Sequence, residues 1–140
     1  MSETDLLRTL VEAEHAAIYG YGVLGARLAE PLRTDAREAD DAHRVRRDEL
    51  ATLLRARRTA VPPTQAAYDV QASQQADALA LAVRLEEGMA LRWRDLVGGT
   101  DDRALRTVGI SALTDTAVRA ARWRRALGRR PGTVALPGDH

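Results

Sequence analysis

The stretch LLRTLVEAEHAAIYGYGVLGARLAE, residues 6–30, predicts a long amphipathic helix with an acid inside its apolar stripe. A helix rotates by about 100° per residue, which places seven positions of this stretch on one face. These positions are Leu7, Leu10, Glu14, Ala17, Tyr21, Leu24 and Leu28. Because a lone buried carboxylate is costly, Glu14 needs a metal ion, a cation or a proton as its partner. Most of what the sequence says about function concerns the identity of that partner.

Length and composition indicate one globular domain over residues 1–140. The formal net charge of +1 gives no reason to expect nucleic acid as a partner. All 21 basic residues are arginine, which we interpret as the codon usage of a high-GC genome. The chain has no cysteine, so disulfides, thiolate metal ligands and thiol nucleophiles are excluded. The first residues are acidic and no long apolar run follows, so we expect a cytoplasmic protein without a membrane segment.

Helical periodicity in four segments predicts an all-α protein. The expected helices cover residues of about 3–30, 35–60, 73–97 and 101–127, followed by an extended tail over 128–140. Ser2 or Thr4 is the expected N-cap of the first helix, and Pro31 is expected to end it. Asp35 and Glu38 have the spacing of a capping box for the second helix.

The lengths of the connections predict how the helices are joined. The first and third connections are short, whereas a segment of roughly a dozen residues containing Pro62 and Pro63 follows the second helix. At about 3.3 Å per residue this segment spans roughly 40 Å, and the second helix is about 36 Å long. The link can therefore travel the whole bundle, which favours a ferritin-like four-helix bundle with a long crossover between helices 2 and 3. The alternative is an up-down-up-down bundle with a loose middle loop.

Four segments and the ending of the chain resemble a ferritin-like domain family of unknown function from high-GC bacteria. They are EHAAIYGYGVLGARL (14–28), AREADDAHRVRRDEL (36–50), LALAVRLEEGMALRWRDLVGGTDD (79–102) and ALTDTAVRAARWRRALG (112–128), followed by ALPG (135–138). The resemblance covers nearly the whole chain and implies a four-helix bundle related to ferritins and rubrerythrins. It implies no activity, because the family has none established.

The spacing of acids and histidine matches part of a ferritin-like metal site. Such di-iron sites take a Glu from each of two helices and a Glu-x-x-His from each of the other two. Here Glu14 and Glu86 are the inward acids of the first and third helices, and Asp40 and His43 form an Asp-x-x-His in the second. The fourth helix departs from the pattern, because Asp115 lies about 100° round from its inward stripe. The candidate ligands for iron or another divalent metal are therefore Glu14, Asp40, His43 and Glu86.

We favour a second interpretation, in which the same centre is a charge cluster without a cofactor. Arg46 and Arg47 flank the inward stripe of the second helix, and Arg119 flanks that of the fourth. A guanidinium shared by two carboxylates satisfies both of them without a metal, and His43 then joins the network as a buried imidazole. This predicts a non-catalytic structural or binding module with a degenerate metal site. The alternative function is an iron-binding oxidase or iron-handling protein that uses the inward acids and histidine.

Several side chains have expected structural roles. Tyr21 is expected in the core or as a partner of Glu14, and His15 is expected beside the helix rather than in the site. Trp93 and Trp123 are expected as core anchors near one end of the bundle. Tyr68 is expected to hold the long link against the helices.

Two motifs of partner binding are weak in this sequence. Residues 20–25 fit the dinucleotide fingerprint G-x-G-x-x-G, but they lie inside a helical stretch rather than after a strand, which indicates helix packing. Arginine runs around residues 55–58 and 122–130 indicate a solvated surface rather than a nucleic-acid interface.

Two other patterns suggest partners. Apolar residues outside the inward stripes favour a homodimer, and they are Tyr19, Val23, Val45, Leu81 and Ile110. Small inward residues either accommodate a small molecule within the bundle or let the helices approach closely, and they are Ala17, Ala39, Ala90 and Ala112.

Overall fold

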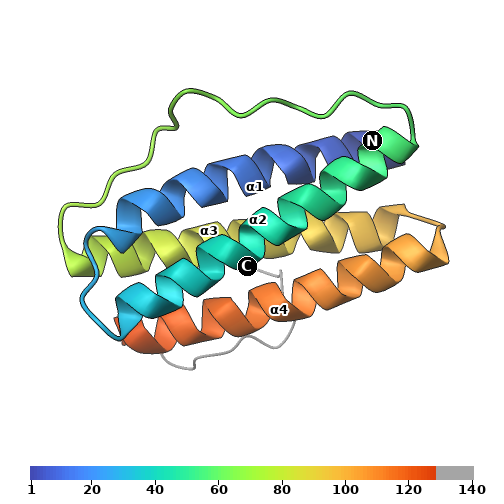
Figure 1. The fold of residues 1–140 in the computed structure, drawn as a ribbon. Coiled ribbons are helices and arrows are strands. Elements are labelled where there is room, and N and C mark those ends of the chain that lie inside the picture. The colour runs from blue at the N-terminus through green and yellow to red at the C-terminus, as the bar shows by residue number, and fades with distance from the viewer. Residues whose placement is uncertain (129–140) are drawn as a thin grey trace.

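The computed structural model describes residues 1–128, and within them four helices lie side by side (Figure 1). The helices are α1 (Glu3–Gly25), α2 (Leu32–Ala56), α3 (Gln75–Gly99) and α4 (Arg103–Leu127). Residues 1–128 contain no β-strand, so the all-α, four-helix prediction is confirmed. The tail that we predicted over residues 128–140 lies outside the described residues, except for Gly128.

Side-chain capping fixes the start of three helices. Ser2 and Asp5 form a capping box at α1, in which each side chain accepts from the backbone N–H of the other at 3.1 Å. At α3 the Asp77 carboxylate accepts from the backbone N–H of Gln74 at 3.0 Å. Asp102 accepts from the backbone N–H of Leu105 at 3.1 Å and so caps α4.

The boundaries of the first two helices differ from the prediction. Helix α1 ends at Gly25 rather than near residue 30, because the chain turns at Ala26, whose backbone N–H bonds the carbonyl of Leu24. Helix α2 begins at Leu32, directly after Pro31, because the fixed φ of proline suits the start of a helix. Asp35 therefore lies inside the first turn of α2, and the predicted capping box is wrong. Helix α2 also ends earlier, at Ala56, while α3 and α4 begin two residues later than predicted.

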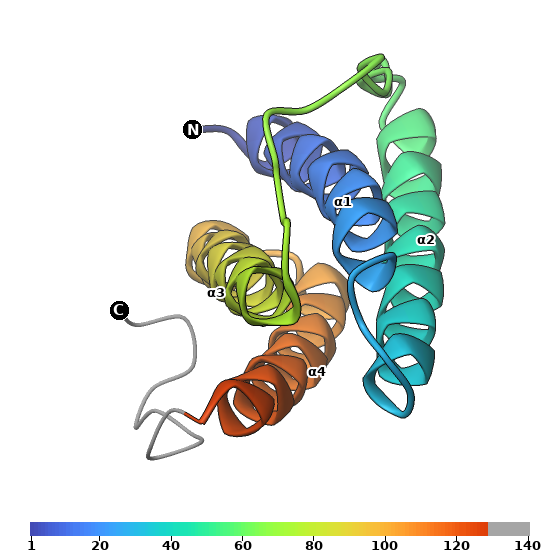
Figure 2. The ribbon, with the colours of Figure 1, turned by 90° about the vertical axis from the view of Figure 1, so that its left-hand side faces the viewer.

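The helices enclose one core, but they do not contact each other equally. Helix α1 packs against α2 and α3, and α3 packs against α4, whereas α2 and α4 approach less closely (Figure 2). The link over residues 57–74 runs along the outside of α1 and reaches α3 at the end of the bundle where α2 begins (Figure 1). Helices α2 and α3 therefore run in the same direction.

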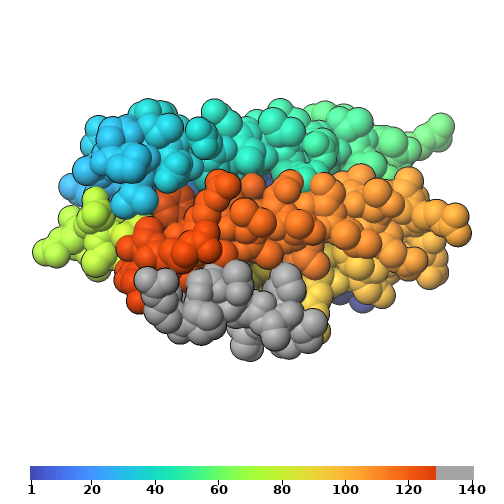
Figure 3. All heavy atoms as spheres, turned by 90° about the horizontal axis from the view of Figure 1, so that it is seen from below, coloured from blue at the N-terminus to red at the C-terminus, as the bar shows by residue number. Residues whose placement is uncertain are grey.

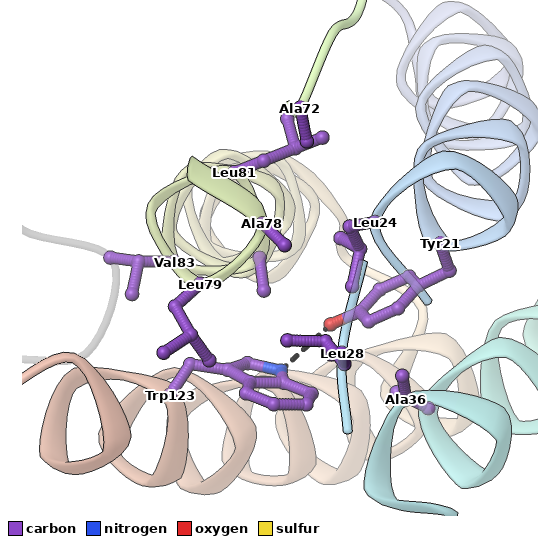
Figure 4. Close-up of a cluster of buried hydrophobic side chains, with 12 residues drawn as sticks. Tyr21, Leu24, Leu28, Ala36, Ala72, Ala78, Leu79, Leu81, Val83 and Trp123 are labelled. Carbon is purple, nitrogen blue, oxygen red and sulfur yellow. Dashed lines mark hydrogen bonds between the residues drawn. The ribbon is translucent and has the colours of Figure 1, made fainter. Parts of the chain in front are cut away.

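The apolar core forms two clusters. One contains Leu7, Leu10, Leu50, Leu54 and Trp93 among others, and the other contains Tyr21, Leu24, Leu28 and Trp123 among others (Figure 4). The prediction that both tryptophans lie near one end is wrong. Trp93 and Trp123 both lie late in their helices, and α3 and α4 are antiparallel, so the two indoles are at opposite ends.

Candidate functional site

Three charged side chains from three helices meet in the middle of the bundle. Glu14 of α1, His43 of α2 and Glu86 of α3 are each 0% exposed. The Nδ1 atom of His43 lies 2.6 Å from Oε2 of Glu14, and its Nε2 atom lies 2.8 Å from Oε2 of Glu86. Inward positions on successive helices thus place an imidazole between two carboxylates.

His43 is held as an imidazolium. Carboxylate oxygens accept hydrogen bonds, so both ring nitrogens act as donors when the two acids are ionised. Burial alone would lower the pKa of His43, but the charge of Glu86 and the hydrogen bonds to both carboxylates raise it to about 10. His43 is therefore positively charged at neutral pH.

Glu86 is the most fully bonded member of the cluster. Its Oε2 atom also accepts a hydrogen bond from the Tyr21 hydroxyl, and its Oε1 atom accepts from Nε of Arg119 at 3.0 Å. Burial alone would raise the pKa of Glu86, but the charge and hydrogen bond of His43, together with Arg119, lower it to about 2. Glu86 is therefore ionised throughout the physiological range.

An aromatic chain extends the cluster toward one end of the bundle. The indole N–H of Trp123 donates to the Tyr21 hydroxyl at 2.9 Å (Figure 4), and the Tyr21 ring stacks on His43 with centroids 5.4 Å apart. Burial and the adjacent charge of Glu86 raise the pKa of Tyr21 well above its ordinary value. Tyr21 therefore stays protonated and donates to Glu86.

The pKa of Glu14 is shifted in the opposite direction to that of Glu86. Its Oε2 atom bonds His43, but its Oε1 atom is buried and has no hydrogen-bond partner among residues 1–128. Burial raises the pKa of Glu14 and outweighs the lowering effect of His43. Glu14 is thus the weakly held acid of the pair.

Helix α4 contributes a cation to the cluster. The side chain of Arg119 is 16% exposed and bonds Glu86, while the hydroxyl of the inward residue Thr116 donates to the backbone carbonyl of Ala112 at 2.7 Å. Two carboxylates therefore face one imidazolium and one guanidinium. When both acids are ionised, these two negative and two positive charges balance.

Only one of the three predicted flanking arginines reaches the centre. Arg46 instead bonds Asp115 at 2.9 Å across the face where α2 and α4 lie side by side (Figure 3), and it bonds Glu49 at 3.1 Å. Arg47 bonds its neighbour Asp48 at 3.1 Å. These two arginines form ion pairs near the surface and do not contact the buried cluster.

The structure does not bring Asp40 into the site. Its side chain is 25% exposed and bonds Nε of Arg44 at 3.1 Å, one turn along α2. Glu14, His43 and Glu86 are therefore the predicted site residues that come together.

Hydrogen bonds within the cluster occupy the nitrogen and oxygen atoms of His43 and Glu86 that a metal ion would need. A histidine binds a metal through an unprotonated nitrogen, but both ring nitrogens of His43 face carboxylate oxygens at hydrogen-bonding distance. Arg119 occupies the remaining oxygen of Glu86. Within residues 1–128, no group of three or more His, Cys, Asp and Glu side chains is placed to hold a metal ion.

Residues 7–140 match the model of a family described as domain of unknown function DUF4439. The chain belongs to the DUF4439 family. A solved structure of a conserved hypothetical protein, rv2844, from Mycobacterium tuberculosis is similar to this DUF4439 domain. The two share 36% sequence identity at a TM-score of 0.86, with 89% of this chain and 96% of that chain covered. A comparison with curated proteins finds no match.

Sequence reasoning missed one buried cation of this DUF4439 domain. Arg124 is 6% exposed and its Nε atom bonds Oε1 of Glu87 at 3.2 Å, although we assigned its arginine run to a solvated surface. The signal was available in part, because the preceding residue Trp123 is inward and a neighbour of an inward position lies near the helix interface.

The outer surface agrees only partly with the apolar residues predicted to lie there. Val45 and Ile110 are 57% and 50% exposed, and Tyr19 is 36% exposed. Leu81 is buried against the core instead, so its assignment to the surface is wrong. The homodimer predicted from these residues stays a prediction.

In the part of the DUF4439 domain that the structure describes, every helix falls short of the length or apolar character that spanning a membrane would require.

Proposed function

We propose that this chain is a ferritin-like four-helix bundle in which an internal ion network occupies the position of a metal site. The parallel α2 and α3, joined by a link that runs the length of the bundle, support the ferritin-like crossover. The observation that carries the proposal is His43, whose two nitrogens each bond a carboxylate of a different helix. On this reading the domain is a non-catalytic structural or binding module.

The network supplies what a metal would supply to the fold. Glu14 and Glu86 bring two negative charges into the core, and a metal ion would neutralise them by coordination. His43 and Arg119 neutralise them here, and charge-assisted hydrogen bonds join all four helices at one point. A buried charge that is both paired and hydrogen-bonded is tolerated, whereas one left alone is not.

One observation favours the alternative function, an iron-binding oxidase or iron-handling protein. Oxygen Oε1 of Glu14 is buried without a partner among the described residues, and a divalent cation would satisfy it. Binding through His43 and Glu86 would then require His43 to lose a proton and Arg119 to leave Glu86. Metal binding is thus in competition with the network.

Metal titration and nitrogen NMR together test the proposal. The protein is purified without chelator, its metal content is measured, and ferrous iron is added without oxygen before exposure to air. We expect no stoichiometric metal and no absorption band of oxidised iron, and we expect both ring nitrogens of His43 to be protonated at neutral pH.

The opposite result has a clear form. Tight binding of one or two equivalents of iron that is lost in His43→Ala and retained in the control His15→Ala would establish the alternative. A neutral His43 in the metal-free protein would also contradict the ion network.

A further inference from the structure

A groove on the outer side of α1 and α2 is separate from the ionic cluster. It has a volume of about 860 Å³, and its walls are α1, α2 and the part of the link that contains Pro62 and Pro63. Small-molecule sites have volumes of about 300–1,000 Å³ and combine apolar walls with a few polar groups. The groove is therefore of a size to take a small ligand.

Its two long walls differ in chemistry. Helix α1 contributes the apolar side chains Ile18, Tyr19 and Val23. Helix α2 contributes three arginines, Arg44, Arg47 and Arg55, and one acid, Asp48, so its wall has a net positive charge. An apolar wall that faces a cationic wall suits a ligand with an apolar body and an anionic head.

Gly22 keeps the groove open. A Cβ atom added at Gly22 would meet nothing within 4 Å, whereas one added at Gly20 would lie 2.7 Å from Cδ1 of Leu85 on α3. Packing therefore explains Gly20 but not Gly22, although a glycine inside a helix lowers its stability. Gly22 lines both this groove and a second cavity of about 270 Å³ between α1 and α2.

The third wall is tied to α1. The Nε2 atom of His15 donates to the carbonyl oxygen of Pro62 at 3.0 Å, because a carbonyl oxygen can only accept. The Tyr19 ring contacts the Tyr68 ring with centroids 5.3 Å apart. Two side chains of α1 thus hold the link in place beside the groove.

The charges that line the groove leave one cation unmatched. Arg44 pairs with Asp40 at 3.1 Å, and Arg47 pairs with Asp48 at 3.1 Å. The side chain of Arg55 is exposed and makes no hydrogen bond or ion pair with residues 1–128, although its backbone carbonyl accepts from the N–H of Arg58. One unmatched positive charge suits a carboxylate better than a phosphate monoester, which carries a charge of about −1.5 to −2.

We propose that this groove binds an amphiphilic carboxylate, with the apolar chain along α1 and the carboxylate on Arg55. The α1 wall runs from His15 to Val23, which at 1.5 Å per residue is roughly 12 Å, so a chain of medium length suffices. The site lies apart from Glu14, His43 and Glu86, and the proposal does not depend on the function of that cluster.

Titration calorimetry of the full chain with decanoate tests the ligand class. We expect decanoate to bind with a submillimolar Kd. Decanol lacks the charge and decyl phosphate carries too much of it, so both should bind at least about tenfold more weakly, and acetate should give no measurable heat. Failure of decanoate to bind, or tighter binding of decanol or decyl phosphate, would overturn the proposal.

Matched variants test the location. Gly22→Leu should abolish decanoate binding and leave the thermal unfolding midpoint at or above that of the wild type, because the added side chain enters open space. Gly98→Leu is the control, since a Cβ at Gly98 on α3 also meets nothing within 4 Å. Arg55→Gln should weaken binding about tenfold or more, whereas Arg103→Gln on α4 should not change it.

One result would show that decanoate binds outside the groove, and another would show that a second copy of the chain occupies it. Undiminished decanoate binding in both Gly22→Leu and Arg55→Gln would remove the groove as the site. A dimer in light scattering that Gly22→Leu dissociates, without decanoate binding to the wild type, would show that a second copy occupies the groove.

Discussion

Glu14 and Glu86 are the same residue type in one buried cluster, yet their surroundings shift their pKa values in opposite directions. Glu86 accepts from His43, Tyr21 and Arg119, so both of its oxygens are bonded and its pKa is about 2. Glu14 accepts from His43 alone, and burial raises its pKa. The number of donors that each acid receives therefore decides which of them anchors the network.

Replacing each acid by its amide should separate these roles. Glu86→Gln leaves His43 and Arg119 with too little negative charge in a buried site, and we expect a loss of about 3–5 kcal/mol in the free energy of unfolding. Glu14→Gln removes a charge from an oxygen pair that is only half bonded, and we expect a smaller loss of about 1–3 kcal/mol. Urea denaturation measures both. Glu12→Gln on the exposed side of α1 is the control, and an equal or larger loss for Glu14→Gln would contradict this ranking.

At the scale of elements, the close contact between α3 and α4 depends on a glycine, Gly109. A Cβ atom at the buried Gly109 of α4 would lie 2.8 Å from Cγ2 of Val97 on α3. Valine has essentially one χ1 rotamer in a helix, so Val97 cannot turn away. Gly109 therefore sets how closely these two antiparallel helices approach, whereas Gly22 of α1 faces open space.

Substitution by alanine should change the free energy of unfolding in opposite directions at these two glycines. Gly109→Ala should lower the free energy of unfolding by about 1–3 kcal/mol, because the helices must separate to admit the methyl group. Gly22→Ala should raise it by up to about 1 kcal/mol, because alanine favours the helix and nothing opposes it. Thermal unfolding followed by circular dichroism measures both variants. Stabilisation by Gly109→Ala would show that α3 and α4 have slack at this contact.

At the scale of the whole molecule, the sequence predicts features that arise within one helix, but not those that depend on how separate helices and the link pack together. The buried stripe from Leu7 to Leu24 follows from helical period alone, and so does the inward position of His43. The choice of Arg119 over Arg46 as the partner of the buried acids could not be predicted, because it depends on the separation of α2 and α4. The groove depends on the path of the long link, which no periodic pattern encodes.

The buried cluster also sets how the stability of the whole fold depends on pH. His43 has its ordinary pKa of 6.5 raised to about 10, so its contribution is complete below pH 6.5 and is lost as the pH rises to about 10. Glu86 has its pKa lowered from 4.5 to about 2, so its contribution is complete above pH 4.5 and is lost as the pH falls to about 2. Glu14 affects stability in the opposite direction to Glu86. Its pKa is raised from 4.5, so the folded protein favours the protonated acid and the ionised acid lowers stability above pH 4.5.

The alkaline side gives the sharper measurement, because His43 dominates it. Loss of one proton from His43 on unfolding predicts that the free energy of unfolding falls by about 1.4 kcal/mol per pH unit above pH 6.5, until the pH reaches about 10. Urea denaturation across this range measures the slope. His43→Gln should be less stable at pH 6.5 and should lose the slope, whereas His15→Gln should keep it. A wild-type stability that is flat over this range would mean that His43 is neutral in the folded protein, and the two carboxylates would then need another partner.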